Sequence, residues 1–365
     1  MEMEWLAWVL LAAVLLFTTI FLRLGGLVPL FDAALAIYLR LFWDKDGCYC
    51  DAKVLGFLMK WQLARHPLSR RWVLMWRQFR CRATKKCIEL SDYKFMYLEH
   101  GSASRERPTV LLLHGFTSGK EEWSEIMRLL GSACHVIAVD MPGHGETTRN
   151  PRGDHSIVGA VARVRQFVEA VGILEHGFHV VGSSWGGHVA GVYASKYPDR
   201  LHSLTLMCPS GLEPKNITRF VRALMEGRNY LLPVDSEEFA EFLSCVFYRQ
   251  PPLPRWALAI GLRDRVPHYP FFETVFDQLM EPDQRFLLQK SLVDIKAATL
   301  AMWGKYDQVL DPSGLEILSK EISNCEGHSL DECGHTVAIE QAAAAGNLIK
   351  QHILRHHQNS VVNIH

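Results

Sequence analysis

The sequence Gly182-Ser-Ser-Trp-Gly186 places one serine at the centre of a G-x-S-x-G pattern. The apolar run Phe178–Val181 precedes it, and small and apolar residues typical of a helix follow it. A serine at the tip of a sharp strand-to-helix turn is presented for nucleophilic attack. Side chains two residues before or after Ser184 would collide with the crossing strand and helix, which accounts for Gly182 and Gly186. The same pattern occurs by chance in Gly/Ser turns, so its chemistry depends on partners elsewhere in the chain.

A serine hydroxyl becomes a nucleophile when a histidine takes its proton and a carboxylate orients that histidine. His335 follows the last predicted strand, where a short loop can return toward the serine, whereas His328 lies within that strand. Asp307 follows the preceding predicted strand. Asp311 is the competing acid, but it stands before a proline and is predicted to cap a helix. We therefore predict Ser184, Asp307 and His335 as the catalytic residues.

The tetrahedral intermediate of acyl transfer needs two oriented N–H donors. The amide of Trp185, directly after the nucleophile, is predicted to supply one. The loop after the predicted strand Thr109–Leu113 supplies the other, which we assign to the amide of Phe116. In that loop we interpret His114 as an orienting residue and not as a general base. We interpret His144, in a tight loop further along, as structural.

Short apolar runs separated by helical lengths begin near Lys86 and predict an α/β fold with a mostly parallel sheet. We predict an opening hairpin and then six strands, with a helix capped by Ser156 and ending near Gly172. The hairpin and strands are 87–90, 94–98, 109–113, 135–139, 178–181, 201–207, 299–303 and 327–330. Between Pro209 and Leu292 no strand fits, so we predict a helical cap at about 210–292 over the carboxyl edge of the sheet.

The first part of the chain predicts a membrane anchor. Trp5–Leu22 is an uncharged apolar run of a length that spans a bilayer core. Its acidic start and the absence of a small-residue cleavage site argue against a removed signal peptide. Basic residues follow the span, which predicts a single pass with the catalytic domain facing the cytoplasm. We predict an anchor and interfacial segment at 1–43, a basic and aromatic juxtamembrane region at 44–85, the catalytic domain at 86–355, and a tail at 356–365.

Ala52–Ile88 holds ten Lys or Arg residues and no Asp or Glu, interleaved with aromatic residues. Such a pattern occurs in nucleic-acid binding or on a solvated helix face. Next to a membrane span it favours contact with anionic lipid headgroups, and we predict no nucleic-acid partner. The nine cysteines are irregularly spaced and lack the paired spacing of a zinc site, so we predict free thiols in a reducing compartment, with no metal and no cofactor.

The motifs taken together resemble the membrane-anchored α/β-hydrolase-domain monoacylglycerol lipases. The motifs are His114-Gly-Phe, Asp140-Met-Pro-Gly-His, Gly182-Ser-Ser-Trp-Gly-Gly187, the run Trp303–Asp311, and Cys333-Gly-His335. The resemblance covers roughly residues 86–355 and the span, and it implies the α/β-hydrolase fold and the same three catalytic residues. It departs at Trp185, where the family usually has methionine, and the larger ring is expected to narrow the acyl pocket. The segment 24–86 is longer than the family leads us to expect.

The resemblance implies a serine hydrolase that cleaves monoacylglycerols, including 2-arachidonoylglycerol, and lysophospholipids, in the endoplasmic reticulum, endolysosomal or plasma membrane. Two alternatives stay open. A C–C bond hydrolase of the meta-cleavage type shares the Ser-Asp-His arrangement, although its substrates are soluble acids and need no membrane anchor. A non-catalytic membrane adaptor on a hydrolase fold is the other, although such proteins often lose a triad residue. Dehalogenases and epoxide hydrolases carry aspartate at the turn, which Ser184 disfavours.

Overall fold

The computed structural model describes residues 82–90, 92–250, 258, 262 and 265–362. The chain divides into two compact units, 1–63 and 64–365, and every described residue belongs to the second. The predicted span Trp5–Leu22 and most of the basic segment lie outside the described residues. Within the described part, none of the helices combines the length and apolarity that a bilayer crossing requires.

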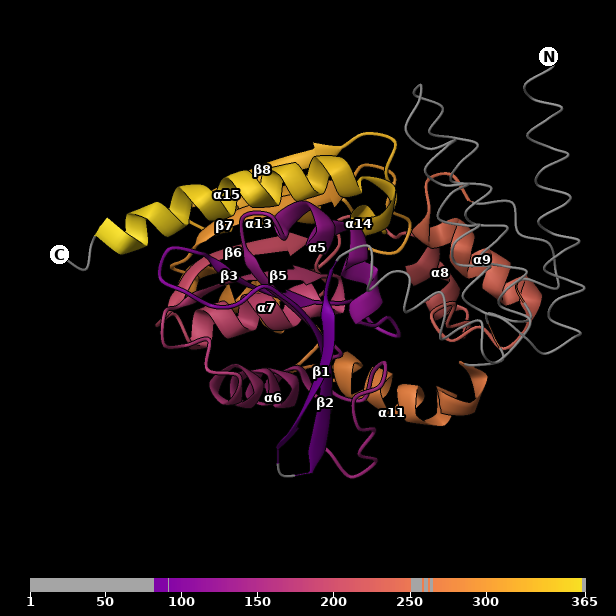
Figure 1. Ribbon diagram of the computed structural model, residues 1–365. Helices are drawn as coiled ribbons and strands as arrows, with labels where there is room; N and C mark the ends of the chain where they lie inside the picture. Colours follow the sequence, from indigo (N-terminus) through magenta and orange to yellow (C-terminus); the bar gives the residue numbers. More distant parts are fainter. Residues whose placement is uncertain (1–81, 91, 251–257, 259–261, 263–264, 363–365) are drawn as a thin grey trace, which may run out of the picture. The chain divides into compact units, whose positions relative to one another are not determined.

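The elements alternate between strands and helices along the chain (Figure 1). The strands are β1 (Thr84–Leu90), β2 (Tyr93–His100), β3 (Thr109–Leu113), β4 (His135–Val139), β5 (Phe178–Ser183), β6 (Leu201–Met207), β7 (Ala298–Gly304) and β8 (Cys325–Leu330). The helices are η1 (Lys120–Trp123), α5 (Ser124–Leu130), α6 (Ile157–Ala170), α7 (Trp185–Lys196), α8 (Arg219–Met225), α9 (Ser236–Val246), η2 (Val266–His268), α11 (Tyr269–Met280), α12 (Leu287–Ser291), η3 (Leu292–Asp294), α13 (Gly314–Glu321), α14 (Val337–Glu340) and α15 (Ala342–Val362).

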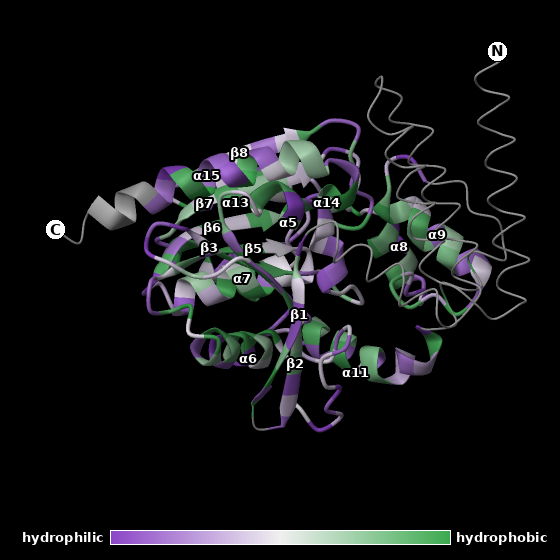
Figure 2. Ribbon diagram, in the orientation of Figure 1, coloured by the Kyte–Doolittle hydropathy of each residue, from purple (hydrophilic) through white to green (hydrophobic). Residues whose placement is uncertain are grey.

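One eight-stranded sheet forms the centre, in the order β1-β2-β4-β3-β5-β6-β7-β8. The pairs β1–β2 and β2–β4 are antiparallel and the others are parallel. The central strands β3 and β4 are buried along their whole length, as expected of parallel strands covered on both faces. The outer strands β1 and β8 carry exposed hydrophilic residues, which appear purple in Figure 2 and keep the sheet edges from pairing with other chains.

Helices cover both faces of the sheet. Helix α15 packs against α5, and α6 packs against α7, with α15 and α6 on opposite sides of the sheet in Figure 1. The predicted cap of α6 is confirmed, because the Ser156 hydroxyl accepts the Gly159 N–H at 3.0 Å. Helix α6 buries Val161, Val164 and Phe167, which lie at helical spacing and anchor it on the core. Both faces of the sheet are therefore covered by helices.

Between β6 and β7 the described residues form helices and turns, in the region where the sequence predicts a cap. This insertion has a small apolar core of its own, contributed mainly by α8 and α9. It is tied to the loop after β7, because the Asp311 carboxylate accepts the Asn216 N–H at 2.7 Å and the Thr218 hydroxyl donates to the Val309 carbonyl at 2.9 Å. The insertion thus meets the sheet at its carboxyl edge.

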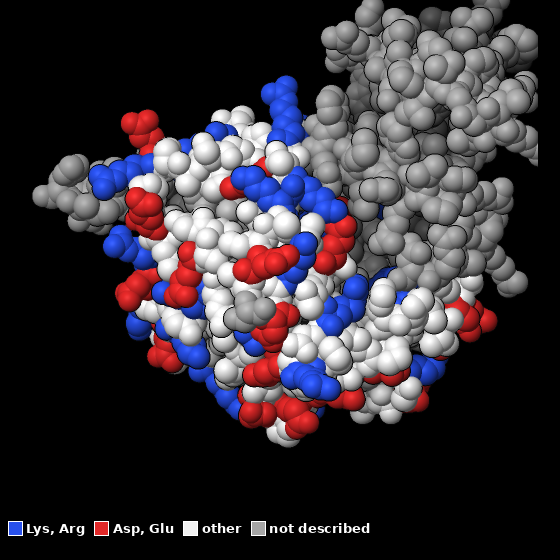
Figure 3. Space-filling model, turned by 60° about the horizontal axis from the view of Figure 1, so that its bottom comes forward, with Lys and Arg blue, Asp and Glu red and all other residues white. Residues whose placement is uncertain are grey.

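Two observed bounds differ from the predicted domain limits. Strand β1 begins at Thr84, inside the predicted 44–85 region, because Thr84 pairs with Glu99 on β2. Helix α15 runs to Val362, through most of the predicted tail 356–365. His357 on this extension contacts the Arg105 carbonyl at 3.0 Å, a long-range bond that no local sequence pattern indicates. On the face shown in Figure 3, acidic and basic side chains are intermixed among the described residues.

Candidate active site

Ser184 stands between β5 and α7 with backbone angles φ 53° and ψ −117°. A non-glycine residue with positive φ is strained, and such strain is typical of a functional turn. The two flanking glycines make the turn possible. A Cβ on Gly182 would lie 2.3 Å from the Gly186 carbonyl oxygen, and one on Gly186 would lie 2.2 Å from the Leu113 carbonyl oxygen. Ser184 is partly exposed, whereas its neighbours in β5 and α7 are buried.

Asp307 and His335 meet at the ends of β7 and β8, as the sequence predicts. The Nδ1 atom of His335 lies 2.7 Å from Asp307 Oδ2. The other oxygen, Oδ1, accepts the amides of Val309 at 2.8 Å and Leu310 at 2.9 Å. These bonds satisfy the buried carboxylate and fix its plane. The competing acid, Asp311, instead accepts the Ser313 hydroxyl and the Asn216 amide, so it has a structural role. It is not the predicted helix cap, because the N-cap of α13 is Ser313.

The contact with Asp307 determines the hydrogen-bonding state of His335. A carboxylate only accepts, so Nδ1 carries the hydrogen and Nε2 of the neutral ring keeps its lone pair. Burial lowers the pKa of His335, but the charge and hydrogen bond of Asp307, with smaller contributions from Glu122 and Glu340, raise it above its ordinary value. The ring is therefore a base that readily holds a proton as imidazolium. His328, by contrast, pairs with Glu326 on β8 and takes no part in this site.

Backbone bonds tie Ser184 to the end of β6 and the segment that follows it. Its amide donates to the Met207 carbonyl at 2.9 Å, and its carbonyl accepts from Ser210 at 3.1 Å. Cys208, which follows Met207, has its sulfur within 4.8 Å of one ligand atom each of Asp307 and His335. Among the described residues, Cys208, Asp307 and His335 form the one group whose ligand atoms lie close enough together to hold a metal ion. Burial raises the pKa of the Cys208 thiol well above its ordinary value, so the thiolate that a metal requires is disfavoured.

The loop 114–118 lies against the serine on its other side. A Cβ on Gly115 would lie 3.3 Å from Ser184 Cβ and 3.9 Å from its Oγ. His114 orients this loop, as predicted: its Nε2 accepts the Met141 amide at 2.9 Å, so its Nδ1 carries the hydrogen and donates to the Gly115 carbonyl at 2.7 Å. In a trans peptide the N–H points opposite the C=O. The Phe116 N–H therefore points away from the His114 ring.

An aromatic cluster surrounds the two predicted N–H donors. The Trp185 ring stacks on His144 at a centroid distance of 4.5 Å, and Phe116 contacts both rings. Phe272 of α11 lies 5.0 Å from His144 and 5.8 Å from Phe116, measured between ring centroids. Burial lowers the pKa of His144 well below its ordinary value, so this ring is neutral and packs as an apolar group. The cluster links the insertion to the turn that carries Ser184.

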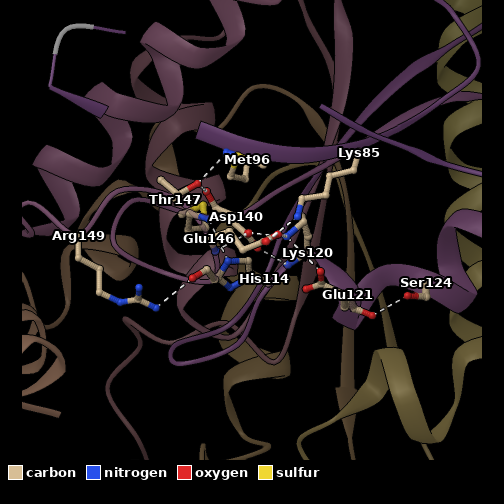
Figure 4. Close-up of polar contacts among 12 residues, drawn as sticks. Lys85, Met96, His114, Lys120, Glu121, Ser124, Asp140, Glu146, Thr147 and Arg149 are labelled. Atoms are coloured by element: carbon tan, nitrogen blue, oxygen red, sulfur yellow. Dashed lines mark hydrogen bonds and ion pairs between the residues drawn. The ribbon is translucent and has the colours of Figure 1, made fainter. Parts of the chain in front are cut away.

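A buried ionic cluster, which the sequence did not reveal, holds the loop after β3 to the loop after β4 (Figure 4). The Lys120 ammonium is fully buried and lies 2.7 Å from Asp140 Oδ2, 2.7 Å from Glu146 Oε2 and 3.1 Å from Glu121 Oε1. Asp140 also accepts the backbone amides of Lys120 and Glu146. Burial lowers the pKa of Lys120, but the Asp140 and Glu121 charges outweigh it and raise that pKa. This cluster holds the end of the loop 114–118 against the loop after β4.

His188 forms a second support that the sequence analysis missed. It lies one turn into α7, accepts the Leu288 amide at 3.1 Å through Nε2, and faces the Ser210 hydroxyl at 3.4 Å through Nδ1. Burial lowers the pKa of His188 to about 3, so it is neutral at physiological pH. It joins the helix behind Ser184 to the end of the insertion at α12.

This fold and site define a class of protein. Residues 108–342 match the family model for the alpha/beta hydrolase fold, and the chain belongs to that family. Within it, the chain is 37% identical over 304 residues to monoacylglycerol lipase ABHD6 of Rattus norvegicus, an alignment that covers 81% of this chain and 89% of that protein. The human protein of the same name has the same identity and coverage. The resemblance inferred from the motifs is thus confirmed.

Solved structures agree with this placement. The crystal structure of a membrane phospholipase A, described as a bacterial virulence factor, superposes with a TM-score of 0.73 at 29% identity and covers 90% of this chain and 99% of that one. A meta-cleavage product hydrolase from Pseudomonas fluorescens superposes with a TM-score of 0.63 at 24% identity, covering 74% and 98%. At that identity the second match reports the fold alone.

Proposed function

We propose that this protein is a serine hydrolase that cleaves the acyl ester of monoacylglycerols through an acyl-serine intermediate. The observation that carries the proposal is the buried contact between Asp307 and His335 at the strand ends, together with the strained turn that presents Ser184. The relatives named monoacylglycerol lipase support the substrate class. Lysophospholipids and 2-arachidonoylglycerol are the finer substrate assignments to be tested.

In the proposed mechanism, His335 Nε2 takes the proton of the Ser184 hydroxyl as the serine oxygen attacks the ester carbonyl. The tetrahedral intermediate collapses, the carbon–oxygen bond to glycerol breaks, and His335 gives its proton to the glycerol oxygen. Water then gives a proton to His335 Nε2 and attacks the carbonyl carbon of the acyl-serine. The carbon–oxygen bond to Ser184 breaks, His335 returns the proton to the serine oxygen, and the fatty acid leaves. Asp307 holds the ring and stabilises the imidazolium in both halves.

The negative oxygen of each intermediate is proposed to rest between the amides of Phe116 and Trp185. Trp185 opens α7, and its amide is one of the first four of the helix, which have no acceptor within the helix. The Phe116 amide is oriented by the bond between His114 and the Gly115 carbonyl. Both donors belong to the backbone, so the surrounding side chains act on them through shape and orientation.

Replacing the nucleophile tests this function. We expect Ser184→Ala to lose both monoacylglycerol turnover and labelling by a fluorophosphonate, with an unchanged thermal transition, because only one oxygen atom is removed. Turnover that persists in this variant would contradict the assignment. Turnover of a meta-cleavage diketone with no ester hydrolysis in the wild type would favour the C–C hydrolase alternative, and a wild type inert to both substrates and to the label would favour the adaptor.

We also propose the predicted topology: one span at Trp5–Leu22, a cytoplasmic catalytic domain at 86–355 with its cap at 210–292, and a 44–85 region held on anionic lipid. The positive charges after the span support this orientation. In full-length protein made in mammalian cells, alkaline carbonate should leave the protein in the membrane, and Asn216 in its Asn-Ile-Thr sequon should carry no sugar. A decrease in the apparent mass of the protein on endoglycosidase treatment would show that Asn216 carries a sugar. The catalytic domain would then face the lumen and not the cytoplasm.

A further inference from the structure

Glu340, in the short helix α14, contacts two segments that lie far apart in the sequence. Its Oε2 accepts the Gly334 N–H at 2.9 Å and the Thr336 hydroxyl at 3.1 Å. Its Oε1 accepts the Tyr248 N–H at 2.8 Å, 92 residues away. The first two donors flank His335, and the third lies just after α9 of the insertion. One carboxylate therefore joins the histidine loop to the insertion.

The backbone reinforces the same junction. The Val246 carbonyl, at the last residue of α9, accepts the His335 N–H at 2.9 Å and the Thr336 N–H at 3.2 Å. The junction is closely packed, because a Cβ on Gly334 would lie 2.8 Å from the Val246 carbonyl oxygen. A larger residue at this position would therefore displace the backbone. The His335 backbone is thus held mainly by the end of a cap helix, and not by β8 from which its loop departs.

The charge of Glu340 also reaches the imidazole. Burial raises the pKa of Glu340, although the amides of Gly334, Tyr248 and Arg249 and the Thr336 hydroxyl favour its ionised form. Glu340 in turn is one of three carboxylates, after Asp307 and Glu122, that raise the pKa of His335. The nearby Cys333 thiol is neutral because burial raises its pKa to about 12. The Arg249 guanidinium is engaged by Glu332 on the surface.

We propose that Glu340 is a positioning residue for the hydrolysis proposed above: its carboxylate clasps the histidine loop to the end of α9 and so sets where His335 stands. The inference rests on the proposed role of His335. It follows that movement of the insertion, for instance when a lipid enters, is transmitted to the imidazole through the junction of Val246, Tyr248 and Glu340. A displacement of about 1 Å at a catalytic group can cost about 100-fold in rate.

Two variants separate position from charge. In Glu340→Gln one carboxylate oxygen becomes an NH₂ group, which faces an N–H donor and breaks one side of the clasp. We expect kcat to fall between about 10- and 100-fold, with KM within about twofold. Because one negative charge near His335 is lost, the acid limb of the kcat/KM profile should move to lower pH. Glu340→Asp keeps the charge and shortens the reach, so its kcat should fall while its acid limb stays.

The matched control is Glu332→Gln. Glu332 lies in the same loop, is exposed, and pairs with Arg249 at 2.7 Å. Losing this surface carboxylate should leave kcat and the acid limb as in the wild type. A Glu340→Gln enzyme with wild-type kcat and an unmoved acid limb would overturn the proposal. The proposal would also be overturned if kcat fell only in proportion to the loss of folded protein and the acid limb of the kcat/KM profile stayed unmoved in both Glu340 variants.

The outcomes also distinguish this inference from the function on which it rests. If Ser184→Ala and the wild type hydrolyse monoacylglycerol equally, the serine-hydrolase assignment fails. If hydrolysis depends on Ser184 and only the Glu340 variants behave as wild type, the function stands and the clasp fails. If Glu340→Gln expresses poorly, the pH profile of Glu340→Asp tests the proposal alone. The proposed positioning role then predicts a reduced kcat with an unchanged acid limb.

Discussion

Two buried ionic groups lie near Ser184, and they differ in how completely their polar atoms are satisfied. In the cluster of Lys120, the ammonium meets three carboxylates and Asp140 accepts two backbone amides as well. In the pair of Asp307 and His335, the carboxylate is fully bonded but the imidazole uses only Nδ1 among its described contacts. The first arrangement holds two loops together, and the second leaves one nitrogen free to take a proton.

The difference teaches where chemistry is placed in this fold. A buried charge must be paired, since an unpaired one is costly. Lys120 is paired on every side and has a raised pKa, so its charge is permanent at physiological pH. Burial lowers the pKa of His335, but Asp307 and two further carboxylates outweigh it and raise that pKa, which favours proton uptake. We therefore expect the Lys120 cluster to contribute to stability and the pair of Asp307 and His335 to contribute to the proposed reaction.

The largest expected effect breaks the reactive pair. Asp307→Asn keeps the size of the side chain but presents an amide to the imidazole and favours the wrong tautomer. We expect kcat to fall by about 10⁴-fold, as carboxylate-to-amide changes do in Ser-His-Asp triads. Steady-state kinetics on a monoacylglycerol measure it, and Asp311→Asn is the control at the competing acid. If Asp311→Asn proved the more damaging to kcat, the assignment of the acid would be wrong.

The next effect breaks the structural cluster. Lys120→Met removes the ammonium and leaves Asp140 buried without its cation, which is expected to cost about 3–5 kcal/mol in the free energy of unfolding. Chemical denaturation followed by fluorescence measures the change. Stability equal to that of the wild type would show that the cluster contributes no more than an apolar contact.

The pH dependence sharpens the same comparison. In the proposed mechanism His335 acts as a base when neutral. We therefore expect kcat/KM to rise with pH through the raised pKa of His335, so that the acid limb lies above pH 6.5, the ordinary pKa of histidine. The effect on stability has the opposite sign. Because the pKa of His335 is higher in the folded protein, His335 contributes a stabilising free energy that is fully present below its pKa in the unfolded chain. This contribution is lost as the pH rises through the pKa of His335 in the folded protein. An acid limb below pH 6.5 would contradict the raised pKa.

The smallest effect is at the exposed edge of the Lys120 cluster. Lys85 pairs with Glu146 but is partly exposed. Lys85→Met should lower the free energy of unfolding by less than about 1 kcal/mol, as surface ion pairs usually do. Comparing Lys85→Met with Lys120→Met under identical denaturation conditions separates the effect of burial on the free energy of unfolding from the effect of charge. A cost as large as that of Lys120→Met would mean that burial does not decide the energy.

The sequence predicted those features that short patterns encode. The sequence predicted the approximate positions of all eight strands. The buried parallel strands were the clearest, because their apolar runs and helical spacers have distinct lengths. The strained turn at Ser184 was predictable from its two flanking glycines. Asp307 and His335 were chosen because parallel strand ends share one edge, and the structure brings the two residues together. Their roles in catalysis remain predictions.

The remaining features depend on contacts between distant residues. Lys120 and Asp140 are 20 residues apart and lie on different loops, and nothing near either residue indicates a buried ion pair. In the sequence, Glu340 resembles any other helix residue. Its partner is the backbone N–H of Tyr248, and a backbone donor leaves no signature in the sequence. His144 was predicted as structural, but its stacking on Trp185 follows from how two loops fold together.

The most direct measurement is the mass of the trapped acyl-enzyme. Brief incubation with a monoacylglycerol and acid quenching, followed by peptide mass spectrometry, should find the acyl group on the peptide that carries Ser184, and on that serine alone. Asp307→Asn should show far less of it at the same time point. An acyl group on another residue, or turnover with no acyl-serine in either protein, would contradict the account.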